Sequence, residues 1–162
     1  MFKRSFLLVT LAVMAVLTGC ATSSQPVSLA DTVAAQPQLS TFNTLLVKSG
    51  VADSLKGAQP VTVFAPTNDA FAKVPAKTME ALSSDPAKLK AVLTYHLVAG
   101  KIMAADVKNG NQKTMNGASV ALAKAGDFVT VEDAMVQTPD ISASNGVVHM
   151  VDSVLMPPAA HH

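Results

Sequence analysis

The chain has 162 residues, a formal net charge of +1 and 49% hydrophobic residues, a length that suits one domain able to bury its own core. Every basic residue after Arg4 is a lysine, and the chain has no Trp and a single Tyr, so it lacks the guanidinium forks and aromatic platforms that read nucleic acids. We therefore expect no nucleic-acid partner.

The first nineteen residues have the pattern of an export signal. Lys3 and Arg4 form a short basic region, and the apolar run at 5–17, about a dozen residues long, is short for a bilayer span. Small residues then precede the only cysteine, and Leu17-Thr18-Gly19-Cys20 resembles the lipobox of bacterial lipoproteins. We predict a signal peptide over 1–19 and a membrane anchor of lipid on the sulfur of Cys20. An ordinary signal peptide with an incidental cysteine, or an uncleaved anchor, are the alternatives.

The residues that follow the cysteine are small and polar, and we predict a flexible tether over 20–26. At about 3.5 Å per extended residue the tether reaches only about 25 Å, which keeps the domain close to the bilayer. Ala21 resembles the enterobacterial signal for outer-membrane sorting, so we expect an outer-membrane location if the organism is Gram-negative. Residues 159–162 are expected to form a disordered tail.

The domain itself, predicted over 27–158, opens with helices. Ser28 and Asp31 have capping-box-like spacing, and apolar residues at 39–46 mark a helical face that stops at Gly50. Asp85-Pro86 offers a cap and a proline at the first helical position, ahead of an i, i+3, i+4, i+7, i+8 apolar stripe that ends near Gly100. We predict one helix across this stripe, which consists of Leu89, Val92, Leu93, His96 and Leu97.

Strands are predicted mainly in the second half. One early run, 61–65, is β-branched and aromatic and lies between two prolines, so it suits a short buried strand. Turns at Asn116-Gly117 and Gly126-Asp127 separate later runs, which predicts antiparallel hairpins, and the last and longest strand is expected over 147–156. Helices first and strands afterwards indicate an α+β domain. We expect these residues to form the core: Val63, Phe64, Phe71, Leu89, Val92, Leu93, Leu97, Val148, Val151 and Leu155.

Three segments resemble signatures of the fasciclin-like, or FAS1, domain. They are residues 61–71 (Val-Thr-Val-Phe-Ala-Pro-Thr-Asn-Asp-Ala-Phe), Tyr95-His96, and residues 145–152 with Val154-Leu155. The resemblance implies the FAS1 fold, a compact wedge of mostly antiparallel β-strands flanked by N-terminal and central helices. It also implies a binding module, because FAS1 domains occur in adhesion and matrix proteins and in exported bacterial lipoproteins.

Most signature residues have a structural interpretation. Thr67 and Asp69 suit caps of the next helix, and His96 suits a core histidine satisfied by a carboxylate or a backbone carbonyl. The resemblance also implies a contact role for Tyr95 and His96, because the Tyr-His region of metazoan relatives has been proposed to contact integrins. We expect a structural role for the other signature positions, which are Thr67, Asn68, Asp69, Phe71, Asn145, Gly146 and His149.

A further candidate contact segment is Pro139-Asp140-Ile141, which resembles the integrin-recognition segment of vertebrate matrix fasciclin domains. An exposed carboxylate beside an apolar side chain suits the metal site of a receptor. However, Thr138 and Ser142 replace that segment's glutamate and methionine, and bacteria have no integrins. The alternative is a turn ahead of the final strand, with Asp140 bonded to nearby backbone amides.

The sequence contains no Gly-x-Ser-x-Gly elbow, phosphate loop or His-x-x-x-His pair, so we expect no enzyme, no metal site and no cofactor besides the lipid on Cys20. We predict a membrane-anchored, monomeric module that contacts proteins or polysaccharides of the envelope, of a neighbouring cell or of a matrix. The alternative is a carrier lipoprotein that holds a small apolar molecule in the wedge, since some fasciclin-like proteins bind carotenoids.

Overall fold

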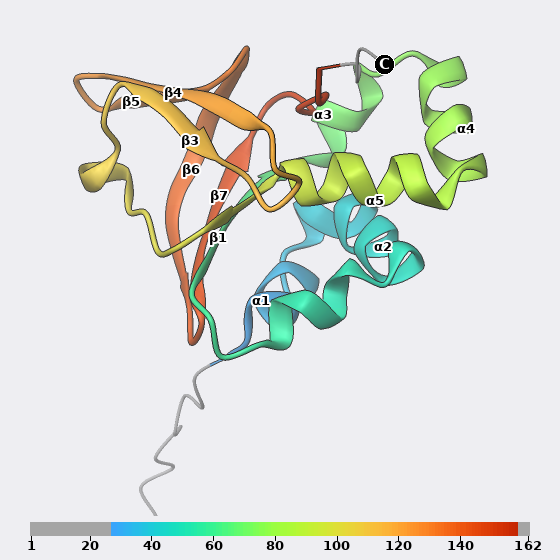
Figure 1. Ribbon diagram of the computed structural model, residues 1–162, viewed down its shortest axis with the longest axis horizontal. Helices are drawn as coiled ribbons and strands as arrows, with labels where there is room; N and C mark the ends of the chain where they lie inside the picture. The colour runs from blue at the N-terminus through green and yellow to red at the C-terminus, as the bar shows by residue number, and fades with distance from the viewer. Residues whose placement is uncertain (1–26, 159–162) are drawn as a thin grey trace, which may run out of the picture.

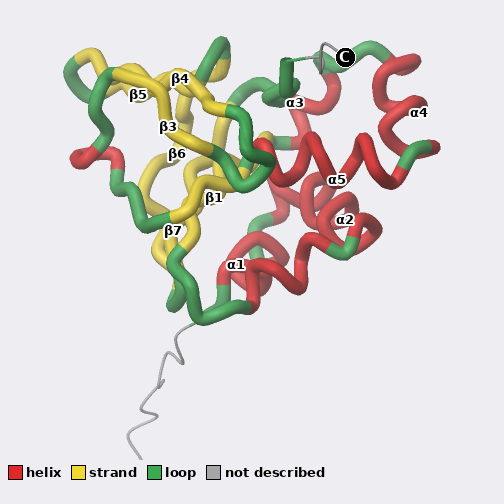
Figure 2. The backbone as a smooth tube through the Cα atoms, in the orientation of Figure 1, coloured by secondary structure: helices red, strands yellow, loops and turns green. Residues whose placement is uncertain are grey.

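The computed structural model describes residues 27–158, and the strands gather on one side of the domain while the α-helices gather on the other (Figure 1, Figure 2). This arrangement is α+β, as predicted. The predicted signal peptide (1–19), the tether with Cys20 (20–26) and the tail (159–162) lie outside the described residues. Within the described range, no helix is long and apolar enough to cross a membrane.

Three of the α-helices begin at residues whose side chains cap them. Ser28 Oγ accepts from Asp31 N at 3.2 Å, Thr67 Oγ1 accepts from Ala70 N at 3.3 Å, and Asp85 Oδ1 accepts from Ala87 N at 3.0 Å. These caps precede α1, α3 and α5 respectively. The α-helices are α1 (Leu29–Ala34), α2 (Ser40–Ser49), α3 (Asn68–Ala72), α4 (Ala76–Ser84) and α5 (Pro86–Tyr95), and the short 3-10 helices are η1 (Pro37–Leu39), η2 (Val51–Lys56) and η3 (Ala104–Asp106).

One seven-stranded sheet has the order β2-β1-β7-β6-β5-β4-β3. Its neighbours are antiparallel except β1 and β7, which run parallel from the pair Val61–Gly146 to the pair Pro66–Val151. A bridge between Val98 and Thr114 joins the two outer strands, so the sheet curls almost into a barrel. The strands are β1 (Val61–Pro66), β2 (Leu97–Ala99), β3 (Gly110–Lys113), β4 (Ser119–Ala125), β5 (Phe128–Val131), β6 (Ala134–Ala143) and β7 (Gly146–Val151).

The central strands β1 and β7 are buried along their whole length, because both faces of the sheet carry a core. Alternate residues of a strand point to opposite faces, so Val63 and Phe64 belong to different clusters. All ten predicted core residues are buried, but they do not pack as one group. Val63, Phe71, Leu89, Val92, Leu93, Leu97 and Val148 form part of the cluster that includes the helices, whereas Phe64, Val151 and Leu155 belong to the cluster inside the curled sheet.

Two predicted elements end earlier than expected. The helix predicted to run almost to Gly100 ends at Tyr95, because Leu97–Ala99 pairs with β1 as strand β2. The prediction of the last strand as the longest is wrong: β7 ends at Val151, and β6 is longer. Beyond Val151 the chain leaves the sheet, where Asp152 Oδ1 accepts from the backbone N of Met135 at 2.8 Å.

Candidate functional site

The candidate contact segment lies inside strand β6, and not in the turn before the final strand. Thr138 pairs with Met150 and Ile141 pairs with Val148, so Pro139 and Asp140 together face His149. Two residues opposite one make a β-bulge, which tolerates a proline because the extra residue is left out of the ladder. The turn of the β6–β7 hairpin is at Ser144-Asn145. The alternative of a turn at 139–141 is therefore wrong, since the strand continues through a bulge, but Asp140 does bond to a backbone amide.

Asp140 is held from two sides at this bulge. Its backbone has φ +59°, in the left-handed region that Asp and Asn adopt more readily than other non-glycine residues. Its N–H donates to His149 Nδ1 at 3.1 Å, and its carboxylate Oδ1 accepts from Ala104 N at 2.7 Å. The side chain nevertheless remains 37% exposed. The structure thus fixes the position of a carboxylate that solvent still reaches.

The two neighbours of Asp140 differ in exposure. Pro139 is exposed, whereas Ile141 is half-buried and packs against the helix-side core. The bulge therefore presents a proline ring beside a carboxylate, and the isoleucine supports the segment from below.

His149 fills the space under the bulge with a side chain that is almost completely buried. Its Nε2 lies 2.7 Å from the carbonyl oxygen of Ile102, and its ring stacks on Phe64 with centroids 5.5 Å apart. Burial lowers the pKa of His149, and the Ile102 carbonyl and the Asp140 carboxylate oppose that shift. The ring is therefore neutral near pH 7.

Tyr95 and His96 lie in the interior, with exposed fractions of 2% and 0%. The Tyr95 hydroxyl reaches Glu132 Oε1 at 3.3 Å, and burial, then the Glu132 charge, raises the pKa of Tyr95. His96 Nδ1 lies 2.8 Å from Val92 O, its Nε2 accepts from Leu155 N at 3.0 Å, and burial lowers its pKa to about 4. Neither side chain can touch a partner while the fold is intact.

Asn145 and Gly146 lock the turn of the β6–β7 hairpin. Asn145 Oδ1 accepts from Leu29 N at 2.9 Å, and its Nδ2 donates to Leu55 O and Gly57 O. Gly146 has φ +156°, and a Cβ there would lie 1.9 Å from the carbonyl oxygen of Val61. Both residues therefore hold the turn against the helices and β1.

Residues of the first signature, 61–71, also connect elements of the fold. Thr67 caps α3, and the Asn68 side chain ties that helix to α2 by accepting from Thr41 N at 3.0 Å. Phe71 is buried in the core, whereas the Asp69 side chain is exposed.

Sequence reasoning missed Ile102, Ala104 and Glu132. Ile102 and Ala104 hold the bulge through main-chain atoms, so no pattern of side chains could have revealed them. Glu132 has φ +52°, and its carboxylate also accepts from Ala121 N at 2.8 Å, which ties the end of β5 to β4.

Within residues 27–158, no group of three or more His, Cys, Asp or Glu side chains is placed to hold a metal ion.

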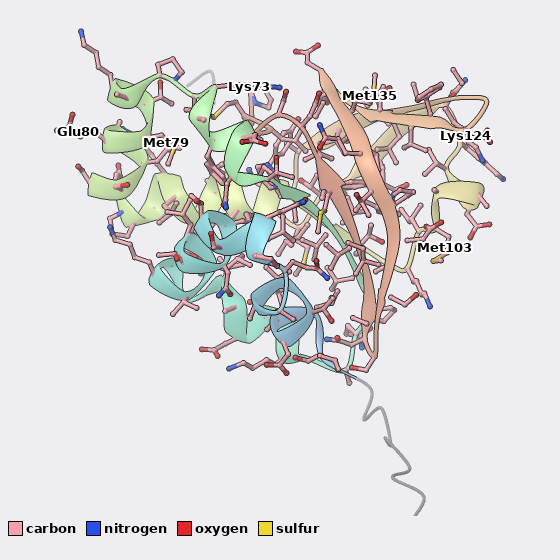
Figure 3. All side chains as sticks on the ribbon, turned by 180° about the vertical axis from the view of Figure 1, so that it is seen from behind. Lys73, Met79, Glu80, Met103, Lys124 and Met135 are labelled. Atoms are coloured by element: carbon pink, nitrogen blue, oxygen red, sulfur yellow. The ribbon has the colours of Figure 1, made fainter. Side chains whose placement is uncertain are left out.

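An apolar hollow of about 370 Å³ lies away from the bulge, between α3, α4 and the segment after β7. Ala70, Val74, Pro75, Val154 and Met156 contribute most of its apolar wall. Lys73 lies at its rim and donates from Nζ to Asp152 O at 3.0 Å. Figure 3 shows Lys73 at the same end of the molecule as Met135.

Known proteins share both the fold and the signature sequences described above. The Fasciclin domain family matches residues 37–157. The chain is 44% identical over 123 residues to protein sll1483 of Synechocystis, covering 73% of this chain and 68% of the relative. It is 40% identical over 142 residues to the immunogenic protein MPB70 of Mycobacterium bovis, covering 85% of this chain and 72% of the relative. It is also 38% identical over 128 residues to the cell surface glycolipoprotein MPB83 of M. bovis, covering 76% of this chain and 57% of that one.

A solved structure has the same fold. A FAS1 domain pair from the insect cell adhesion molecule Fasciclin I superposes with a TM-score of 0.64 at 19% identity. The match covers 81% of this chain and 51% of that chain, so this chain spans about half the length of the pair. The FAS1 wedge expected from the sequence is confirmed, and the chain belongs to the fasciclin family.

Proposed function

We propose that this protein is an exported, membrane-anchored, non-enzymatic module that contacts proteins or polysaccharides of the cell envelope. The observation that carries the proposal is the 38% identity to a protein named as a cell surface glycolipoprotein. The lipobox-like sequence before Cys20 supports the anchor. Likeness to a domain pair of an adhesion molecule agrees with a contact role, although by itself it describes only the fold.

The proposed contact site is the bulge, with Asp140 as its central group and Pro139 beside it. The two hydrogen bonds of Asp140 fix its position before any partner arrives, which lowers the entropy lost on binding. The partially exposed carboxylate can accept hydrogen bonds or meet a cation carried by a partner. Ile141 stabilises the segment from the core side.

The position of the bulge favours a partner within the same envelope. Ser144 N donates to Val27 O at 2.8 Å, so the hairpin turn lies where the tether joins the domain. Asp140 precedes Ser144 by four positions, which is about 13 Å along a strand. Together with a tether of at most about 25 Å, this keeps the contact site within about 40 Å of the bilayer. A partner on a facing cell would have to approach to that distance.

The anchor is tested by replacing the cysteine. In cells grown with a labelled fatty acid, the wild-type protein should incorporate the label and Cys20→Ser should not, because no thiol remains to carry the lipid. A Cys20→Ser variant that still incorporates the label would contradict a lipid on Cys20.

The contact site is tested with beads that carry residues 21–160, mixed with isolated envelope or with host cells. Wild-type beads should bind saturably, and Asp140→Asn should weaken binding about tenfold because the carboxylate charge is lost. Asp127→Asn, at an exposed turn between β4 and β5, is the matched control and should bind as wild type does. Equal binding by Asp140→Asn and wild type would remove Asp140 from the site.

A second candidate function is carriage of a small apolar molecule. The apolar hollow supports it, since about 370 Å³ falls within the usual range of about 300–1,000 Å³ for ligand pockets. A native mass spectrum of protein purified from its own host tests this function. A mass above that of the lipidated chain supports carriage, and the bare mass contradicts it.

A further inference from the structure

His149 connects the bulge to a loop that lies far from it in the sequence. Each ring nitrogen faces a different main-chain group: Nε2 faces Ile102 O, and Nδ1 faces Asp140 N. A carbonyl oxygen only accepts a hydrogen bond and a backbone N–H only donates one, so Nε2 carries the hydrogen and Nδ1 is the acceptor. The observed contacts therefore require a neutral ring in a single tautomer.

The same loop also holds Asp140 directly, because Ala104 N donates to its carboxylate. Four residues thus form a closed set of contacts, which we call the bulge clamp: Ile102, Ala104, Asp140 and His149. Met103 lies between the two loop residues of the clamp. Figure 3 shows it on the strand side of the molecule, away from Met79 and Glu80 of α4. The loop that carries Ile102 and Ala104 is thus on the strand side of the domain, away from α4.

A proton on Nδ1 would disrupt the clamp. Nδ1–H would then face the N–H of Asp140, and two donors cannot share a hydrogen bond. The acceptor that this proton could reach is the Asp140 carboxylate, whose Oδ1 lies 4.0 Å from Nδ1. To bond with Nδ1, this oxygen must move about 1 Å closer and weaken its bond to Ala104 N. Protonation therefore favours a different position of Asp140.

Few charges other than Asp140 face the histidine. Strand β1, which carries the stacked Phe64, has no titratable residue, and Asp140 is the only one in β6. In the loop at 100–104 the only charged residue is the exposed Lys101. The response to pH should therefore come mainly from the pair His149 and Asp140.

We propose that His149 is the positioning residue of the contact site, and that protonation of its ring releases Pro139 and Asp140 so that binding weakens in acid. This inference rests on the contact role proposed for Asp140. His149 itself is too deeply buried to touch a partner. Because burial lowers the pKa of His149, the site stays formed at neutral pH and opens only in acid, and it closes again when the proton leaves.

The experiment is an NMR titration of the full-length, ¹⁵N-labelled protein in detergent micelles from about pH 7.5 to 4.5. The backbone amides of Asp140 and Ala104 should shift with the same midpoint as the His149 ring nitrogens, while the amide of core residue Val63 stays unchanged. In parallel, liposomes that carry the protein are mixed with isolated envelope fragments. One pH unit below the midpoint about a tenth of the rings are neutral, so the apparent affinity should fall about tenfold.

Two variants distinguish a transition of the bulge clamp from a general effect of acid on the protein. His149→Asn keeps an acceptor near the position of Nδ1 but cannot take the proton, so the transition at the Asp140 and Ala104 amides should disappear. Asp140→Asn still accepts from Ala104 N but lacks the charge, so the His149 midpoint should move to lower pH. The second variant tests the clamp even if the first fails to fold.

The inference is overturned if the Asp140 and Ala104 amides stay unchanged while His149 titrates, or if they shift only together with the Val63 amide. A transition of these amides that leaves envelope binding unchanged also overturns it. Absence of binding at every pH, with the amide transition intact, would instead overturn the proposed contact function and leave the proton-dependent clamp supported.

Discussion

The β6–β7 hairpin carries two polar side chains five positions apart whose surroundings are opposite. Asn145, at the turn, makes side-chain hydrogen bonds to three main-chain groups of the helical half, which fix its side chain in one position. The Asp140 side chain, at the bulge, bonds to one main-chain group, and its Oδ2 makes no hydrogen bond within residues 27–158. The signature residue Asn145 therefore stabilises the fold, whereas the Asp140 carboxylate, where strand pairing is interrupted, remains open to solvent.

The largest effect should come from the turn, where Gly146 leaves no room for a side chain. Gly146→Ala places a methyl group against Val61 O, forces β1 from β7, and should cost about 4 kcal/mol or more of unfolding free energy. Urea unfolding measures the loss. Gly126→Ala is the matched control: it has φ +60° but open space around it, and should cost only about 1 kcal/mol. Similar losses in both variants would show that backbone conformation alone matters.

Asn145→Asp should have the second-largest effect. It removes the amide hydrogens that reach Leu55 O and Gly57 O and turns a carboxylate toward those carbonyls. We expect a loss of about 2–3 kcal/mol in urea unfolding. Ser144→Ala, at the exposed neighbouring position, should be nearly neutral. A stable Asn145→Asp variant would mean that the turn does not depend on these bonds.

The pH dependence of stability should be of intermediate size and come mainly from His96. The unfolded chain takes a proton at the ordinary histidine pKa of about 6.5, whereas burial keeps the folded ring neutral down to its pKa of about 4. Stability is therefore full above about pH 6.5, falls as pH drops, and levels off below about 4. Between pH 7 and 5 the loss should be about 2 kcal/mol, with a smaller contribution of the same sign from His149.

Urea unfolding at the two pH values measures this loss, and a His96→Gln variant should respond less to pH because it lacks the buried ring. A wild-type stability that stays constant over this range would mean that water reaches the ring of His96.

Asp140→Asn should have the smallest effect on stability, within about 0.5 kcal/mol. Asn also adopts the left-handed backbone conformation, and its amide oxygen can accept from Ala104 N. Thermal unfolding of this variant beside Asn145→Asp is the direct test of the contrast between bulge and turn. A large loss in Asp140→Asn would make the bulge a structural feature like the turn.

The elements predicted correctly are those whose causes are local. The caps at Ser28, Thr67 and Asp85 and the strand after Pro60 depend on side chains within a few positions, so the sequence shows them directly. The end of α5 could not be predicted, because Leu97 suits the apolar face of a helix as well as a buried strand. Pairing with β1 decides between the two, and that contact is distant in the sequence.

The candidate site was only partly visible in the sequence. Pro139 and Asp140 indicate a break in regular structure, and a turn satisfies that signal as well as a bulge does. Strand β6 lacks strict alternation because Gln137, Thr138 and Pro139 are all exposed, so the period of two does not reveal it. The loop that holds the bulge contributes only main-chain atoms.

Closure of the sheet by the bridge between Val98 and Thr114 has a consequence for encounters between copies of the chain. Open strand edges invite pairing between copies and irreversible aggregation. Here β2 and β3 meet through that bridge and through a hydrogen bond from Met115 N to Leu97 O at 2.7 Å. Strand β3, which precedes these contacts, is Gly-Asn-Gln-Lys and is therefore polar and short. Within residues 27–158 the closed sheet therefore offers a second copy of the chain little free strand edge to pair with.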